Sequence, residues 1–126
     1  MSARVWLRRA YHPSTPNDGH RVLVDRVWPR GVTRAALQLD EWCREVAPSD
    51  ALRRWYGHDV QRWAEFKKRY HEELAHGEPA AALATLVERA RVGRLTLVFG
   101  ARDAPHSQAA VLREVIEAAL ADSVRR

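Results

Sequence analysis

The apolar positions of the chain fall into three short runs and five stretches with helical spacing. Residues 5–7, 21–28 and 95–99 are rich in valine, leucine and aromatic side chains and predict β-strands, because these residues favour extended backbone. Residues 22–24 are apolar without interruption, which is typical of a strand that is covered on both faces. Residues 11–19 carry two prolines and an Asn-Asp-Gly turn sequence and predict a loop.

Helices are expected in the rest of the chain, and several of their ends carry residues that start or stop helices. The expected helices cover residues 39–46, 50–56, 60–76 and 79–93, with a last helix opened by Ser107. Ser49 and Asp59 can accept hydrogen bonds from the first free N–H groups of the helices that they precede. Gly57 follows the helix at 50–56 and is a typical C-terminal stop.

Strands separated by helices predict an α/β fold. We expect a single small domain over residues 1–126, with a short, mostly parallel three-stranded sheet and surrounding helices. The pairing of the first two strands stays open. The connection at residues 11–20 is near the minimum for a parallel crossover and has no helical signal, so a wide antiparallel hairpin is the alternative. In a parallel sheet, ligands bind beyond the carboxyl ends of the strands.

Composition narrows the class of protein. A single cysteine, Cys43, excludes an intramolecular disulfide and a cysteine-based zinc cage. Residues 1–4 lead into an apolar stretch that is interrupted by charges, and no apolar run approaches the roughly 18–20 residues of a membrane span. We therefore expect no signal peptide, no membrane partner and a cytoplasmic location. The chain has neither a Walker loop nor a Gly-x-Gly-x-x-Gly sequence, so no cofactor is expected.

The charge balance favours an anionic partner. The net charge is +5, and 19 of the 21 basic residues are arginine. A guanidinium group binds phosphate or carboxylate through two parallel hydrogen bonds, and it tolerates partial burial better than an ammonium group. The alternative is that arginines scattered along helices are only solvated surface residues.

A first candidate cluster lies where the strand at 21–28 ends. Arg26 and Arg30 could bind an anion between them, and strand alternation would place Arg26 and Trp28 on one face. The alternative interpretation pairs both arginines with Asp25 or with helix carboxylates and places Trp28 in the core.

A second cluster, in residues 100–107, follows the strand at 95–99 and precedes a helix. The free N–H groups of a helix start favour an anion, and Arg102 adds a positive charge. Histidine is the side chain whose ordinary pKa lies nearest neutrality, so His106, together with Asp103, is the candidate for acid/base catalysis. Alternatively, Asp103 or Ser107 only caps the helix, and Arg102 pairs with Asp103 at the surface.

A third cluster surrounds the helix at 50–56. Arg53 is expected to reach the same cleft, and His58 follows the helix. Cys43 is expected to be a buried, unreactive thiol. His71 and His76 are five residues apart, which misses the spacing of two ligands on one helix face, so no metal site is predicted.

Together these segments resemble the YeaO-like branch of domain-of-unknown-function family 488. The string Asp-Arg-x-Trp-Pro-Arg-Gly at residues 25–31 is highly specific, and the resemblance covers nearly the whole chain. It is carried, in chain order, by residues 18–31, Trp42, 47–49, 52–55, 58–59, Phe66, Tyr70, 95–98 and the sequence Arg102-Asp103-x-x-His106.

The resemblance implies a fold and a site location more than a reaction. A second branch of the family has a cysteine in the late strand-to-helix loop. Here Gly100 and Ala101 stand near that position, which excludes a thiol mechanism there. The YeaO-like pattern usually has asparagine after the histidine, whereas this chain has Ser107, which keeps a helix cap but not an amide contact to a ligand.

Two classes of function follow from the sequence. In the first, the chain binds a small phosphate- or carboxylate-bearing ligand in an arginine-lined cleft at the carboxyl ends of the strands, with acid/base catalysis as an extension. In the second, it is a nucleic-acid-binding or partner-binding module without catalysis. Because basic and acidic residues are interleaved, we expect at most weak, non-specific affinity for nucleic acid.

Overall fold

The computed structural model describes residues 4–125, and the side chains of residues 4–122. The expectation about a signal peptide rests partly on residues 1–3, which lie outside this range. The strands are β1 (Val5–Arg9), β2 (His20–Leu23), β3 (Glu41–Trp42) and β4 (Leu95–Phe99). The helices are α1 (Arg34–Leu37), α2 (Asp50–Tyr56), α3 (Trp63–Leu74), α4 (Gly77–Val92) and α5 (Gln108–Arg125).

The sheet has four strands in the order β1-β4-β2-β3, and every pair is parallel. The α/β class is confirmed, whereas the prediction of three strands is wrong. β4 lies between β1 and β2, with Leu97 beside both Leu7 and Val22. The first two strands are therefore not neighbours, and neither a direct parallel pairing nor a hairpin joins them.

The additional strand β3 lies where a helix over residues 39–46 was predicted. Leu39, Trp42 and Val46 have helical spacing, but Glu41 and Trp42 pair with β2 instead. The backbone N–H of Cys43 donates to Leu23 at 2.9 Å, and a single 3₁₀ turn follows at 44–46. Pairing satisfies the outer edge of β2, which would otherwise expose unpaired backbone groups.

β2 is shorter than the predicted strand at 21–28. Its last ladder contact is the N–H of Val24, which donates to Val98 at 3.0 Å, and the chain then leaves the sheet. Val27, expected in the strand, has 58% of its surface exposed. The prediction that alternation sends Arg26 and Trp28 to one face is therefore wrong, because neither residue belongs to the strand.

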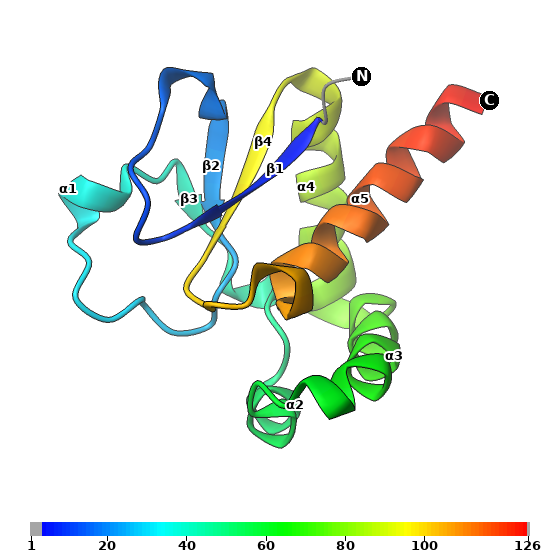
Figure 1. Cartoon of the computed structure of the whole chain (residues 1–126). Helices are drawn as coiled ribbons and strands as arrows, with labels where there is room; N and C mark the ends of the chain where they lie inside the picture. Colours follow the sequence, from blue (N-terminus) through cyan, green and yellow to red (C-terminus); the bar gives the residue numbers. More distant parts are fainter. Residues whose placement is uncertain (1–3, 126) are drawn as a thin grey trace.

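The sheet is covered on both faces. On one face, the larger core joins Val22, Leu97 and Phe99 to α3, α4 and α5. On the other face, a smaller core contains Leu23 and Val98 with side chains of α1 and the loops around it. Figure 1 shows the carboxyl ends of β2 and β4 directed to the same lower side of the molecule, where α2 lies. The double cover explains why all of β4 is buried.

The loop at 11–19 contains a buried ion-pair network that its polar sequence did not reveal. The Asp18 carboxylate is 1% exposed and accepts hydrogen bonds from Arg21 at 2.6 Å and Arg8 at 3.1 Å. Burial would raise the pKa of Asp18, but hydrogen bonds from Thr15, Arg21 and Arg8 outweigh it and lower the pKa to about 2. The network anchors the loop between β1 and β2.

The helix ends follow the sequence signals in α2. The Ser49 hydroxyl accepts a hydrogen bond from the N–H of Leu52 at 3.1 Å, and Gly57 ends the helix in the left-handed conformation. The predicted helix at 60–76 begins with a 3₁₀ turn at 60–62, and α3 follows. Among the described residues, no helix combines the length and apolar character needed to cross a membrane.

Candidate functional site

A cavity of about 700 Å³ opens beyond the carboxyl ends of β2 and β4. Its walls come from residues 25–30 after β2, residues 100–108 after β4, and residues 47–58 in and around α2. The chain leaves β4 into α5, which packs on β1, whereas it leaves β2 towards β3. Connections that depart in opposite directions leave a crevice between the two strand ends, which is where ligands bind in parallel α/β sheets.

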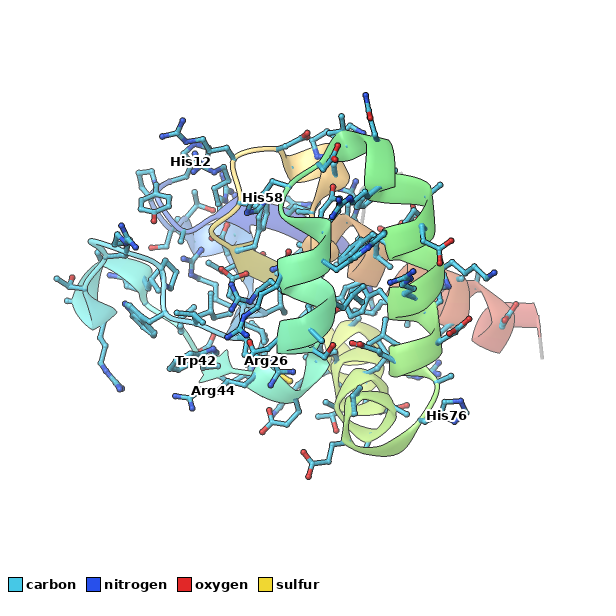
Figure 2. All side chains as sticks on the ribbon, turned by 90° about the horizontal axis from the view of Figure 1, so that it is seen from below. His12, Arg26, Trp42, Arg44, His58 and His76 are labelled. Atoms are coloured by element: carbon cyan, nitrogen blue, oxygen red, sulfur yellow. The ribbon has the colours of Figure 1, made fainter. Side chains whose placement is uncertain are left out.

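All eight residues selected from the sequence line this one cavity. They are Arg26, Trp28, Arg30, Arg53, His58, Arg102, Asp103 and His106. The sequence-based selection missed six polar or aromatic lining residues, namely Tyr11, Asp25, Tyr56, Phe66, Ser107 and Gln108. Figure 2 shows Arg26 and His58 beside α2, whereas His76 lies away from them at the junction of α3 and α4.

Arg26 connects the strand end to the start of α2. Its Nε donates to the carbonyl of Pro48 at 3.0 Å, and its Nη2 donates to the carbonyl of Ala47 at 3.2 Å. Neither of the partners proposed from the sequence, Asp25 or a helix carboxylate, pairs with it in the described part of the chain. Arg26 therefore fixes one wall of the cavity, while its Nη1 donates to no other described residue.

The other arginines differ in their partners. Arg53 forms an exposed ion pair with Asp50 at 3.2 Å on its own helix. Within residues 4–122, Arg30 and Arg102 have no carboxylate within 4.0 Å, and both are exposed. The alternative pairing of Arg102 with Asp103 is absent there, because Asp103 instead contacts His106. Two guanidinium groups at the cavity are thus free to bind an anion.

His106 is held in a defined orientation. Its Nδ1 lies 2.8 Å from Oδ2 of Asp103, and the Tyr56 hydroxyl donates to the His106 carbonyl at 2.8 Å. The edge of the imidazole packs perpendicular to the ring of Trp63, at a centroid distance of 5.2 Å. When Nδ1 carries the proton donated to Asp103, Nε2 is the free acceptor. This arrangement is suited to accepting a proton or hydrogen bond from a ligand.

Trp28 and His58 mainly shape the wall of the cavity. The Trp28 indole N–H donates to the carbonyl of Val32 at 2.7 Å, and its ring packs edge-on against Trp42 at 5.3 Å. Trp28 therefore belongs partly to the smaller core, as the alternative interpretation proposed, while its remaining surface lines the cavity. His58 follows Gly57 with a φ of 60° and packs obliquely against Tyr56 at 6.3 Å.

Asp25 is the main site residue that the sequence-based selection missed. Its Oδ2 accepts the N–H of Gly100 at 2.8 Å, and its Oδ1 accepts the side-chain amide of Gln108 at 2.5 Å. Burial raises the pKa of Asp25 to about 6, although both hydrogen bonds and the charge of Arg53 oppose the rise. A Cβ at Gly100 would lie 3.1 Å from Oδ2, so glycine allows this close approach. The sequence did contain a signal for Asp25, because this carboxylate directly follows the apolar residues 22–24, where the buried strand ends.

The remaining candidate chemistry is structural. Cys43 is buried, and burial raises the pKa of its thiol to about 11, so the reactive thiolate is scarce at neutral pH. Ser49 caps α2 and donates its hydroxyl proton to Glu73 at 2.6 Å. Over the residues that the structure describes, no group of three histidine, cysteine or acidic side chains could hold a metal ion.

Comparisons with known proteins agree with this arrangement of motifs. A family model described as "Inactive DUF488-N3 subclade" matches residues 4–125. The uncharacterised protein Rv3073c of Mycobacterium tuberculosis is 42% identical over 113 residues, which are 90% of this chain and 93% of that protein. The uncharacterised protein YeaO of Escherichia coli is 38% identical over 110 residues, covering 87% and 94% of the two chains. No solved structure matches the chain. The chain therefore belongs to the YeaO-like branch of domain-of-unknown-function family 488.

Proposed function

We propose that this protein binds a small phosphate- or carboxylate-bearing ligand in the arginine-lined cavity. The observation that carries the proposal is the pair of exposed guanidinium groups, Arg30 and Arg102, which have no carboxylate partner among the described residues. A guanidinium group without an anion is a ready partner for a ligand that presents two oxygen atoms.

The charge and size of the cavity support the same class of ligand. Four arginines and two aspartates line it, so it carries a net charge of +2 when both lining histidines are neutral. Its volume of about 700 Å³ falls within the roughly 300–1,000 Å³ of small-molecule sites. A ligand of one or two negative charges balances this field better than a polymer whose charges lie outside the cavity.

Binding is favoured over turnover. The matching family model carries the word "inactive", and the strand-to-helix loop has Gly100 and Ala101 rather than a nucleophile. His106 and Asp103 would accept a hydrogen bond or a proton from the bound ligand. Acid/base catalysis by this pair is the extension that remains to be tested by incubating the protein with phosphate monoesters and measuring released phosphate. Release that disappears in His106→Ala would establish catalysis.

Isothermal titration with inorganic phosphate, pyrophosphate and citrate tests the binding proposal. We expect at least one of these anions to bind, and Arg30→Gln and Arg102→Gln each to weaken its binding about tenfold. Arg54→Gln is the matched control, because Arg54 is exposed on α2 beside Arg53 but does not line the cavity. The proposal is wrong if none of the anions binds, or if Arg54→Gln weakens binding as much as Arg102→Gln does.

A further inference from the structure

Asp25 is a carboxylate without a cationic partner in a cavity lined by arginines. Within the described part of the chain, no lysine, arginine or histidine nitrogen lies within 4.0 Å of its oxygens. Its neighbour Arg26 turns away to two backbone carbonyls. Buried carboxylates in proteins are normally paired or coordinate a metal, because removing the charge from water is costly.

The two hydrogen bonds that Asp25 accepts leave part of its capacity unused. Gly100 donates to Oδ2, and Gln108 donates to Oδ1. An ionised carboxylate can accept about four hydrogen bonds, so each oxygen retains a lone pair for one more donor. The same two contacts fix the carboxylate rigidly between the end of β2 and the start of α5, and the residue lines the cavity.

Charged groups from several elements share the cavity with Asp25. Arg53 of α2 interacts with it electrostatically, and the loops after β2 and β4 bring Arg30, Arg102, Asp103 and His106 to the same cavity. The arginines attract an anionic group, whereas Asp25 repels one. An anion that occupies the arginines and places a donor against Asp25 satisfies both sets of groups.

We propose that the cavity selects anions that also carry a hydrogen-bond donor, a hydroxyl or a protonated amine, and that Asp25 is the acceptor of this group. The inference rests on the proposed function, since the arginines must first hold the anion. It assigns a specificity-determining role to Asp25 and places the ligand among hydroxylated or amino-substituted phosphates and carboxylates. Simple alkyl anions are then poor ligands.

Three phosphate monoesters with the same anionic group test the inference on the unmodified protein. They are ethyl phosphate, 2-hydroxyethyl phosphate and 2-aminoethyl phosphate, and the four-carbon homologues extend the reach of the donor. We expect the hydroxyl or the amino compound to bind at least tenfold more tightly than the alkyl compound of equal length. Preference for the hydroxyl compound identifies a neutral donor, and preference for the amino compound identifies a cationic one.

The second part of the test repeats the three binding measurements on the Asp25→Asn variant. Neutralising Asp25 removes a negative charge, so ethyl phosphate should bind equally well or more tightly, while the tenfold preference for a donor falls below threefold. A residue with only a structural role would weaken all three ligands together, and that result would overturn the inference. Equal affinity of the three esters for the unmodified protein would overturn it while leaving the anion site intact. Failure of all three esters to bind would overturn the inference, and failure of phosphate, pyrophosphate and citrate as well would overturn the proposed function.

Discussion

Replacing Asp25 by asparagine should make the folded protein more stable at neutral pH. The pKa of this carboxyl rises from 3.8 to about 6 on folding, mainly because burial disfavours the charged form. The unfolded chain therefore loses its proton more readily than the folded chain between these two values, and folding stability falls as the pH rises through this window. At about 1.4 kcal/mol for a tenfold change in the ionisation constant, the loss above pH 6 is about 3 kcal/mol.

The asparagine side chain resembles a protonated aspartate, since both are uncharged and both combine a carbonyl oxygen that accepts with a neighbouring group that donates. At pH 4, where Asp25 is largely protonated in the folded protein, the two chains should differ little in their free energy of unfolding. At pH 7.5 the variant escapes the cost of a buried charge. The stability of Asp25→Asn relative to the parent should thus be about 2–3 kcal/mol more favourable at pH 7.5 than at pH 4.

Urea denaturation followed by tryptophan fluorescence measures this difference at both pH values, and five tryptophans provide the signal. Asp122→Asn is the matched control, because Asp122 is exposed on α5 and far along the chain from the cavity. Its relative stability should change little between the two pH values. If the relative stability of Asp25→Asn is equally flat, or favours pH 4, Asp25 is not the destabilised buried acid described above.

Three further measurements probe the rest of the molecule. The Asp18→Asn variant should have a free energy of unfolding about 3–5 kcal/mol lower than that of the parent at pH 7, because two cations then face a neutral group. In the parent protein, the stabilisation by Asp18 should disappear as the pH falls from about 4 towards 2. An acid transition that is the same in the variant and the parent would refute this pH dependence. Cys43 should resist an aromatic disulfide reagent at pH 8 in the native protein and react fully in denaturant, whereas rapid native reaction would contradict its burial. Single-stranded DNA binding, measured by fluorescence anisotropy, should vanish by physiological salt, and tight binding there would favour a nucleic-acid module.

Local signals in the sequence predicted much of the fold. The strand at 95–99 has the predicted bounds, and the Ser49 cap and the Gly57 stop bound α2 as expected. These features depend on residues that are close together in the sequence, so they can be predicted from the sequence pattern alone. β3 does not, because its two residues become a strand only when the edge of β2 is beside them. Likewise, no local pattern indicates that β4 inserts between β1 and β2.

The candidate site likewise has residues that the sequence could predict and contacts that it could not. Arg30 and Arg102 could be selected because both follow strands, and carboxyl ends of parallel strands share one edge of the sheet. The contact between Asp25 and Gln108 joins residues 83 positions apart. Its existence depends on the order of the strands, which the sequence pattern did not provide. From the sequence, Asp25 is a possible partner of the neighbouring arginines. In the structure it accepts the N–H of Gly100 instead.

The buried Asp18 and the partly buried Asp25 contrast a structural carboxylate with one that we propose to be functional. Asp18 is surrounded by two cations and a hydroxyl, so its charge is satisfied and its ionised form stabilises the fold. Asp25 receives only neutral donors, although arginines line the same cavity, and its ionised form destabilises the fold. Asp18 shows that this fold can pair a carboxylate with arginines. Arginines also line the cavity around Asp25, and yet none of them pairs with it. Proteins break such local rules mainly at functional sites, so the unpaired Asp25 supports the proposed ligand site beside Arg30 and Arg102.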